Sequence, residues 1–249
     1  MDFSNLTAEE WLLVITTILI LPVIIFALIA QFRVMSQFGK YSQVMSMSGQ
    51  SGFSTARRLL DQNGLNHVNI EHTRGTLSDH YDPRTKVVRL SDSVYNSTSL
   101  AALAVAAHEV GHAVQDATNY PPLKIRQLVI KTTRLINVML LPLIVIGFLG
   151  MFLMPFFMGG EFFFWFIIAL TVMYGLSALI NVITLPTEFD ASRRAKKMLE
   201  EDNVIQGDEM EGVSKTLGAA ALTYVAALAV SLVYFLRFLS IALILAKRR

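Results

Sequence analysis

Long uncharged apolar stretches alternate with polar segments along the 249 residues of this chain. A helix of about twenty apolar residues is long enough to cross the hydrocarbon core of a bilayer. Four stretches meet this length, and we expect transmembrane helices at residues 11–30, 135–158, 162–185 and 219–246. Most of the side chains that can do chemistry lie in the polar segments between them, residues 31–134 and 186–218. The pattern therefore predicts a single, mainly helical, membrane-embedded unit over residues 1–249.

The first apolar stretch could also be a cleaved signal peptide, which has a positively charged segment in front of its apolar core. The residues before Trp11 include Asp2, Glu9 and Glu10 and contain neither Lys nor Arg. We therefore expect the first span to be retained.

The first polar segment changes its pattern several times. Residues 35–52 are rich in Ser, Gly, Gln and Met without a regular period, which is typical of a loop. Helical spacing of apolar residues predicts a short helix at Ser54–Asn63, and alternation predicts a strand at His67–Glu71. We expect Leu77–Leu90 to form a β-hairpin that turns at Asp82–Thr85. A short β-sheet should therefore precede the next helix.

An alanine-rich run follows at Leu100–Gln115 and contains the sequence His-Glu-Val-Gly-His at residues 108–112. Because alanine favours the helix, His108 and His112 should lie one turn apart on one face, where they can hold a metal ion. Glu109 could then activate a water, as in the HExxH pattern of zinc metalloproteases. Two histidines and a carboxylate would be costly to bury unpaired in so apolar a segment. The run therefore predicts half of a zinc site in a small zincin-like α+β region.

A third ligand is expected from the second polar segment, because a hairpin of two spans would return the chain to the same side of the membrane. A helix that begins near Thr187 would place Glu188 and Ser192 on one face and turn Asp190 away from it. Glu188 is therefore the expected third ligand, with Asp190 in reserve. In the alternative interpretation, the Glu188 carboxylate only stabilises the N-terminus of its helix through the macrodipole.

Further residues are candidates for contacts with a peptide. The returning strand of the hairpin, Val87-Val88-Arg89-Leu90, could serve as an edge to which an extended peptide adds itself. Peptide hydrolysis also needs a hydrogen-bond donor for the oxyanion. The chemically suitable side chains are His80, Tyr95, Tyr120, Arg193 and Tyr224. For each of these a packing or surface role is the more ordinary interpretation, and the sequence does not choose among them.

The composition supports a membrane protein and limits which side chains can bind a metal ion. Hydrophobic residues make up 53% of the chain and charged residues 16%, a balance too apolar for an ordinary soluble domain. The absence of cysteine excludes disulfides and thiolate zinc sites, and it fits a reducing compartment. The net charge of +2 says little by itself, and we expect no nucleic-acid partner.

Lys and Arg are distributed unevenly, which predicts an orientation in the membrane. Residues 31–134 contain twelve and residues 186–218 contain five, whereas the N-terminus and the predicted turn at Gly159–Glu161 contain none. By the positive-inside rule, the active site should face the cytoplasm. The basic tail Lys247–Arg249 disagrees, because four spans would leave it on the opposite side. Either this tail is an exception or the last apolar stretch re-enters.

Two other classes of function compete with hydrolysis. A metal transporter would be expected to carry ionisable residues inside its spans, and residues 11–30, 135–158 and 162–185 contain none. A catalytically silent membrane scaffold or adaptor would have no need for Glu109 between the two histidines. A peptidase that acts on peptides or membrane proteins beside the lipid bilayer is therefore the favoured interpretation.

Four segments together carry a resemblance to a known family. They are Ala107–Ala113, Leu185–Ser192, Asp79–Pro83 and Ala219–Tyr224. With them the chain resembles, over nearly its whole length, the YugP-type "putative neutral zinc metallopeptidases" of bacterial membranes. It is also similar in layout to the HtpX and CAAX-prenyl-protease group, in which a transmembrane hairpin separates HExxH from a Glu ligand.

The resemblance implies a metalloendopeptidase of the bacterial cytoplasmic membrane with one Zn²⁺ ion. His108, His112 and Glu188 would be the ligands and Glu109 the general base. The HtpX-like pattern has an Asp four residues after its Glu ligand, and Ser192 stands at that position here. Asp190 is therefore a candidate to take part beside Ser192 in supporting the ligands.

Overall fold

The chain separates into two compact units in a computed structural model that describes residues 6–129, 138–139, 142, 144–145 and 159–249. One unit, called the span unit below, comprises Met1–Leu28, Arg126–Ile183 and Val225–Arg249. The other, called the site unit, comprises Ile29–Ile125 and Thr184–Tyr224. The predicted polar segments thus contribute most of the site unit.

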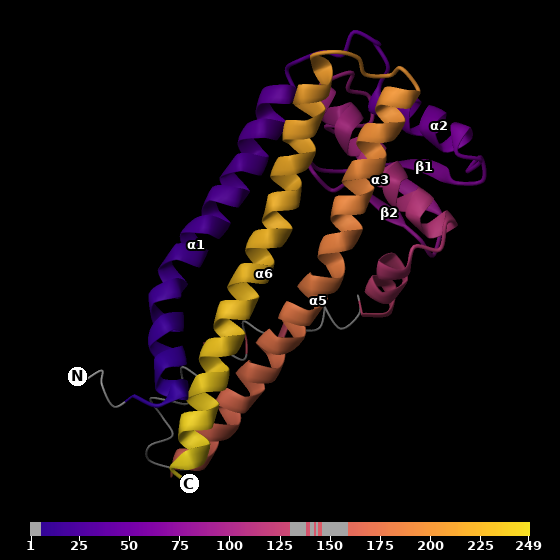
Figure 1. Ribbon diagram of the computed structural model, residues 1–249. Helices are drawn as coiled ribbons and strands as arrows, with labels where there is room; N and C mark the ends of the chain where they lie inside the picture. The colour runs from indigo at the N-terminus through magenta and orange to yellow at the C-terminus, as the bar shows by residue number, and fades with distance from the viewer. Residues whose placement is uncertain (1–5, 130–137, 140–141, 143, 146–158) are drawn as a thin grey trace. The chain divides into compact units, whose positions relative to one another are not determined.

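Three long helices are apolar enough to cross a membrane in the part of the chain that the structure describes. They are α1 (Ala8–Tyr41), α5 (Gly159–Glu201) and α6 (Glu209–Lys247) (Figure 1). They confirm that three of the expected apolar stretches are helical. The expected span at 135–158 lies almost wholly outside the described residues, so four spans are not shown.

Each long helix continues beyond the expected end of its span. Residues 35–41 belong to α1, so the prediction of a loop from Met35 was wrong for its first seven residues. Gly159–Glu161 begins α5 instead of forming a turn, and α5 runs through Pro186 instead of starting near Thr187. The physical reason is that a change from apolar to polar side chains alters the surroundings of a helix but supplies no stop signal.

Ionic contacts join helix ends within the span unit. Lys247 Nζ lies 2.8 Å from Glu9 Oε1, and Arg249 pairs with Glu161. The basic tail at the end of α6 therefore meets acidic groups near the N-terminal ends of α1 and α5. The positive charge of this tail is partly balanced by these acids.

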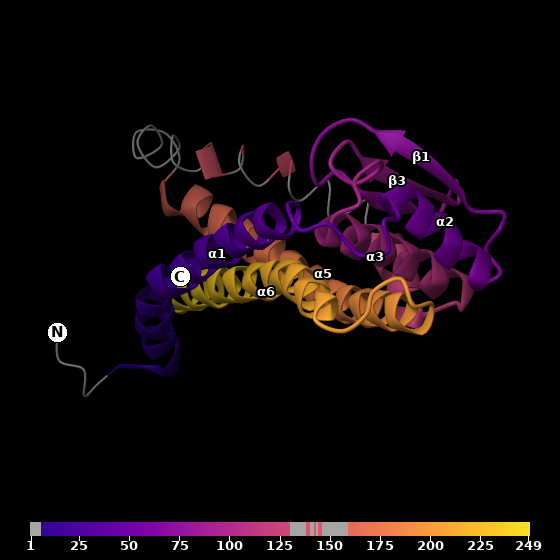
Figure 2. The same ribbon diagram turned by 90° about the horizontal axis from the view of Figure 1, so that it is seen from above.

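The site unit contains the shorter elements: α2 (Gly52–Gln62), β1 (Asn69–Thr73), β2 (His80–Asp82), β3 (Val87–Ser91) and α3 (Leu100–Ala117). Figure 2 shows them together, and α3 packs against α2, β2 and β3. Leu59, Leu60, Leu90 and Leu103 are fully buried in the shared core. The predicted short helix and first strand are confirmed to within two residues, and the predicted hairpin is confirmed with its first strand starting at His80, three residues after Leu77.

The strand order β1-β3-β2 corrects one prediction about substrate binding. β3 pairs in parallel with β1, with Ile70 opposite Val88, and antiparallel with β2, with Tyr81 opposite Val88. Val87, Val88 and Arg89 therefore have a neighbouring strand on both sides, and Leu90 pairs with β1 alone. The prediction that this strand offers a free edge to a peptide was wrong. The hairpin pairs one side of β3 with β2, and β1 pairs with the other side.

Candidate metal centre

The α3 helix holds both histidines of the HExxH sequence on one face. Its first turn is capped by Ser99, whose hydroxyl accepts a hydrogen bond from Ala102 N at 3.3 Å. The spacing of four residues brings the imidazoles of His108 and His112 together, with ring centroids 4.8 Å apart. Small alanine side chains on α3 let neighbouring elements pack closely around this face.

Gly111 allows α5 to approach the histidine-bearing helix. A Cβ atom at this position would lie 2.6 Å from the carbonyl oxygen of Ala191, a distance that real Cβ atoms do not adopt. Glycine is therefore required for the backbones of α3 and α5 to touch here. The contact lies three residues from Glu188 and one residue from Ser192, so it sets the position of both against α3.

Glu188 reaches the two histidines from α5. Its Oε2 atom lies 3.2 Å from His108 Nε2 and 3.6 Å from His112 Nε2, and one ligand atom from each residue lies within 4.8 Å of the others. Two imidazoles and one carboxylate form a donor set used by catalytic zinc sites, which leave a further position open. The donor chemistry and the spacing therefore fit zinc, and this cluster could hold a metal ion.

The imidazole of His112 is held by a residue that sequence reasoning missed. Gln115 is fully buried, and its Nε2 donates to Thr187 O at 2.8 Å and to Asp190 Oδ2 at 2.9 Å. Because the amide nitrogen serves these two acceptors, its Oε1 must accept, and it lies 3.0 Å from His112 Nδ1. With its proton on Nδ1, His112 keeps the lone pair of Nε2 available for a metal ion in the cluster. In the sequence, the only signal of this role is that Gln115 follows His112 by three residues, a spacing that places both on one face of a helix.

Ser192 and Asp190 take different places around the cluster. Ser192 Oγ lies 3.2 Å from His108 Nδ1, so the hydroxyl can accept the proton of that nitrogen. Asp190 is not one of the three residues whose ligand atoms gather, and it pairs with Gln115, Arg193 and Arg194. The structure thus places Glu188 in the cluster, while the reserve candidate Asp190 supports His112 through Gln115.

Glu109 is buried beside the ligand cluster, with an exposed fraction of 8%. Burial raises the pKa of its carboxyl to about 7; the imidazole of His108 opposes this rise, and the carboxylates of Glu188 and Asp79 add to it. The backbone amide of Tyr81 on β2 lies within hydrogen-bonding reach of the carboxylate. A group that titrates near neutrality is suited to accept and return a proton.

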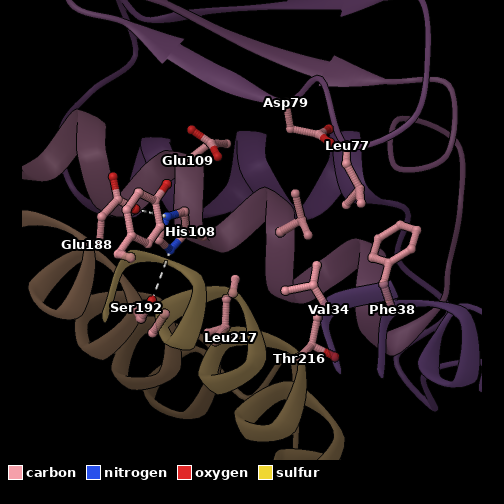
Figure 3. A pocket seen from close by; sticks show the side chains of 14 residues that line it. Val34, Phe38, Leu77, Asp79, His108, Glu109, Glu188, Ser192, Thr216 and Leu217 are labelled. Carbon is pink, nitrogen blue, oxygen red and sulfur yellow. Dashed lines mark hydrogen bonds and ion pairs between the residues drawn. The ribbon is translucent and has the colours of Figure 1, made fainter. Parts of the chain in front are cut away.

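A pocket of about 190 Å³ opens beside Glu109, His108 and Glu188. Figure 3 shows His108 between Glu188 and Ser192 at one end of this pocket. Of the five candidate oxyanion donors, Tyr224 alone lines the pocket. The other four therefore have weaker geometric support.

The remaining candidates lie in other surroundings. His80 is exposed and contacts Ser78 O, and Tyr95 packs against Phe53 and His72. Tyr120 lies beside the guanidinium of Arg194, and Arg193 is largely exposed and pairs with Asp190.

Comparisons with known proteins agree with this chemistry. Residues 16–243 match the family described as "Putative neutral zinc metallopeptidase". The chain is 44% identical over 214 residues to the "Putative membrane protease YugP" of Bacillus subtilis (strain 168), a match that covers 86% of this chain and 90% of the relative. No solved structure matches the chain.

Proposed function

Because the chain belongs to the family described as "Putative neutral zinc metallopeptidase", we propose that it is a membrane-bound zinc metalloendopeptidase with one Zn²⁺ ion. The observation that carries this proposal is the convergence of Glu188 Oε2 on His108 Nε2 and His112 Nε2 at 3.2 and 3.6 Å. A silent scaffold would not require the costly burial of Glu109 next to these three groups.

The chain's own residues divide the work of hydrolysis. When bound, zinc supplies Lewis-acid chemistry that acidifies water and polarises the scissile carbonyl. Glu109 accepts a proton from the attacking water at its carboxylate and later passes that proton to the leaving amine. Gln115 and Ser192 keep the two imidazoles oriented through their Nδ1 atoms, so that both Nε2 atoms face Glu188.

We assign stabilisation of the oxyanion to Tyr224. It lines the pocket that also contains Glu109, His108 and Glu188, and its phenol can donate a hydrogen bond to a developing negative charge. A donor already in place before the reaction lowers the barrier without reorganisation.

The edge available to an extended substrate is β2 in this proposal. The sheet order leaves β2 paired on one side only, and the Tyr81 backbone amide faces Glu109. A peptide that lies along His80–Asp82 would therefore pass close to the general base.

The surroundings of the enzyme are also part of the proposal. The three apolar helices and the membrane relative support a membrane protein. We place it in the bacterial cytoplasmic membrane with the site facing the cytoplasm, on the excess of Lys and Arg in the two polar segments. Peptides or membrane proteins close to the bilayer are the expected substrates.

The test compares the native protein with Glu109→Gln in detergent or lipid, measuring bound zinc and cleavage of a mixed peptide library. We expect the variant to keep its zinc and to lose at least about 10²-fold in cleavage rate, since general base catalysis contributes about 10²–10⁴-fold. Native cleavage should fall when the pH is lowered far enough to protonate Glu109, because this carboxylate must be ionised to accept a proton.

Glu200→Gln is the matched control, because Glu200 is exposed on α5 and does not line the pocket. This control should behave like the native protein. Cleavage by Glu109→Gln at the native rate would refute the role assigned to Glu109.

A further inference from the structure

The pocket beside the ligand cluster becomes apolar away from the three ligands. Leu77, Phe38 and Val34 lie at the end opposite to His108 (Figure 3). Further wall is supplied by small or apolar side chains of α3 and α6: Val105, Leu217, Ala220 and Ala221. One continuous space therefore joins the candidate catalytic groups to a hydrocarbon surface.

The polar side chains of this apolar end are already engaged within the protein. Asp79 accepts hydrogen bonds from Ser91 N at 2.6 Å and from Ser91 Oγ at 2.9 Å. Thr216 Oγ1 donates to Gly212 O at 2.9 Å. A negatively charged group that entered this end would lose its hydration and meet the carboxylate of Asp79 without gaining a matched partner.

Leu77 is held in an unfavourable state at the rim of the pocket. Its φ of 55° lies in the left-handed region, which is costly for a leucine, and its side chain is 45% exposed. The surrounding loop is fixed by the hydrogen bond from Gly75 N to Asp92 Oδ2 at 2.8 Å and by that from Ser78 Oγ to Arg74 O. A strained backbone at an exposed apolar residue does not stabilise the fold. Strain of this kind is typical of binding sites, so it indicates that Leu77 takes part in binding.

The volume of the pocket limits the size of the group that can bind in it. Its volume of about 190 Å³ is below the roughly 300–1,000 Å³ of typical small-molecule sites. We propose that the apolar end receives an apolar side chain of a substrate residue that flanks the scissile bond. This inference rests on the proposed peptidase function and adds a substrate preference to it.

The preference can be measured with peptides that are identical except for the residue next to the cleaved bond. The native protein should cleave a peptide with Leu or Phe there at least about tenfold more efficiently, in kcat/KM, than one with Asp or Ser. Ala220 is half-buried and lines the pocket, so Ala220→Phe should fill it. This variant should lose about tenfold or more on the Leu peptide, favour Gly or Ala instead, and keep its bound zinc.

Two further variants keep the test decisive. Leu77→Gly relieves the left-handed strain and removes apolar wall, so its melting temperature should not fall while its preference for Leu over Asp shrinks. Ala227→Phe is the control, because Ala227 is an exposed residue of α6 that does not line the pocket. It should retain the native preference.

The outcomes separate the two proposals. If the zinc-loaded native protein cleaves none of the peptides, the peptidase function fails, and the pocket assignment fails with it. If it cleaves them without regard to the flanking residue, or if Ala220→Phe and Leu77→Gly both keep the native preference, the pocket assignment alone is overturned.

Discussion

The orientation of His112 depends on one buried amide. Gln115 can satisfy Thr187 O, Asp190 and His112 together only with its oxygen facing the imidazole. A glutamine here does the work that a carboxylate does in many zinc sites, while the negative charge lies one residue further away on Asp190. The arrangement supports the ligand without burying a second carboxylate directly against it.

Replacing Gln115 with leucine should therefore weaken zinc binding by about 10–100-fold, the range typical for loss of such a supporting contact. Competition with a chelator would measure the affinity, and circular dichroism would show whether the helices persist. Gln206→Leu is a suitable control, because Gln206 is exposed and remote in sequence from the cluster. An unchanged affinity in a folded Gln115→Leu protein would contradict the assigned role.

Site residues differed in how far they could be predicted from the sequence. His108, Glu109 and His112 were accessible because helical spacing alone determines their common location. Glu188 required the added assumption that a hairpin of spans returns the chain. Gln115 and its contact with Asp190 join positions 75 residues apart in the chain. Such a contact depends on how α3 and α5 pack, and no local pattern encodes that packing.

The ligand cluster depends on the contact between the helices α3 and α5. Two opposing effects act at Gly111. Alanine would favour the helix by about 1 kcal/mol, but its Cβ would meet Ala191 O at 2.6 Å. Overpacking of this kind costs about 1–3 kcal/mol, and the contact with rigid backbone places this case toward the upper part of that range.

Gly111→Ala should therefore lower the free energy of unfolding by about 1–2 kcal/mol, the net of these two effects, and weaken zinc binding by moving Glu188 away from the histidines. Thermal unfolding and chelator competition would measure the two effects. Gly39→Ala is the matched control, since a Cβ at that helical position meets nothing within 4 Å. It should be neutral or stabilising; a stabilised Gly111→Ala protein with native zinc affinity would contradict the account.

Among the elements, those with strong local signals were predicted best. The α3 helix and the hairpin were recognised from alanine content, alternation and turn residues. The helix ends were missed, because α1 and α5 continue from apolar into polar sequence and Pro186 lies inside α5 without ending it. The central position of β3 in the sheet was missed because strand order is a long-range property.

At the scale of the whole molecule, the site is assembled from distant parts of the chain. Eighty residues separate His108 from Glu188, and the apolar start of α5 lies between them in the sequence. The site unit therefore cannot form from the HExxH segment alone. A helix apolar enough to cross a membrane is part of the covalent path between His108 and Glu188.

The most direct test of this account is the zinc content of the purified native protein and of Glu188→Ala. We predict one zinc per chain in the native protein and loss of most of it in Glu188→Ala. The control Glu200→Ala, which removes an exposed carboxylate from the same helix, should retain the metal. A native protein without zinc, or a Glu188→Ala protein that binds zinc as tightly as the native one, would contradict the account.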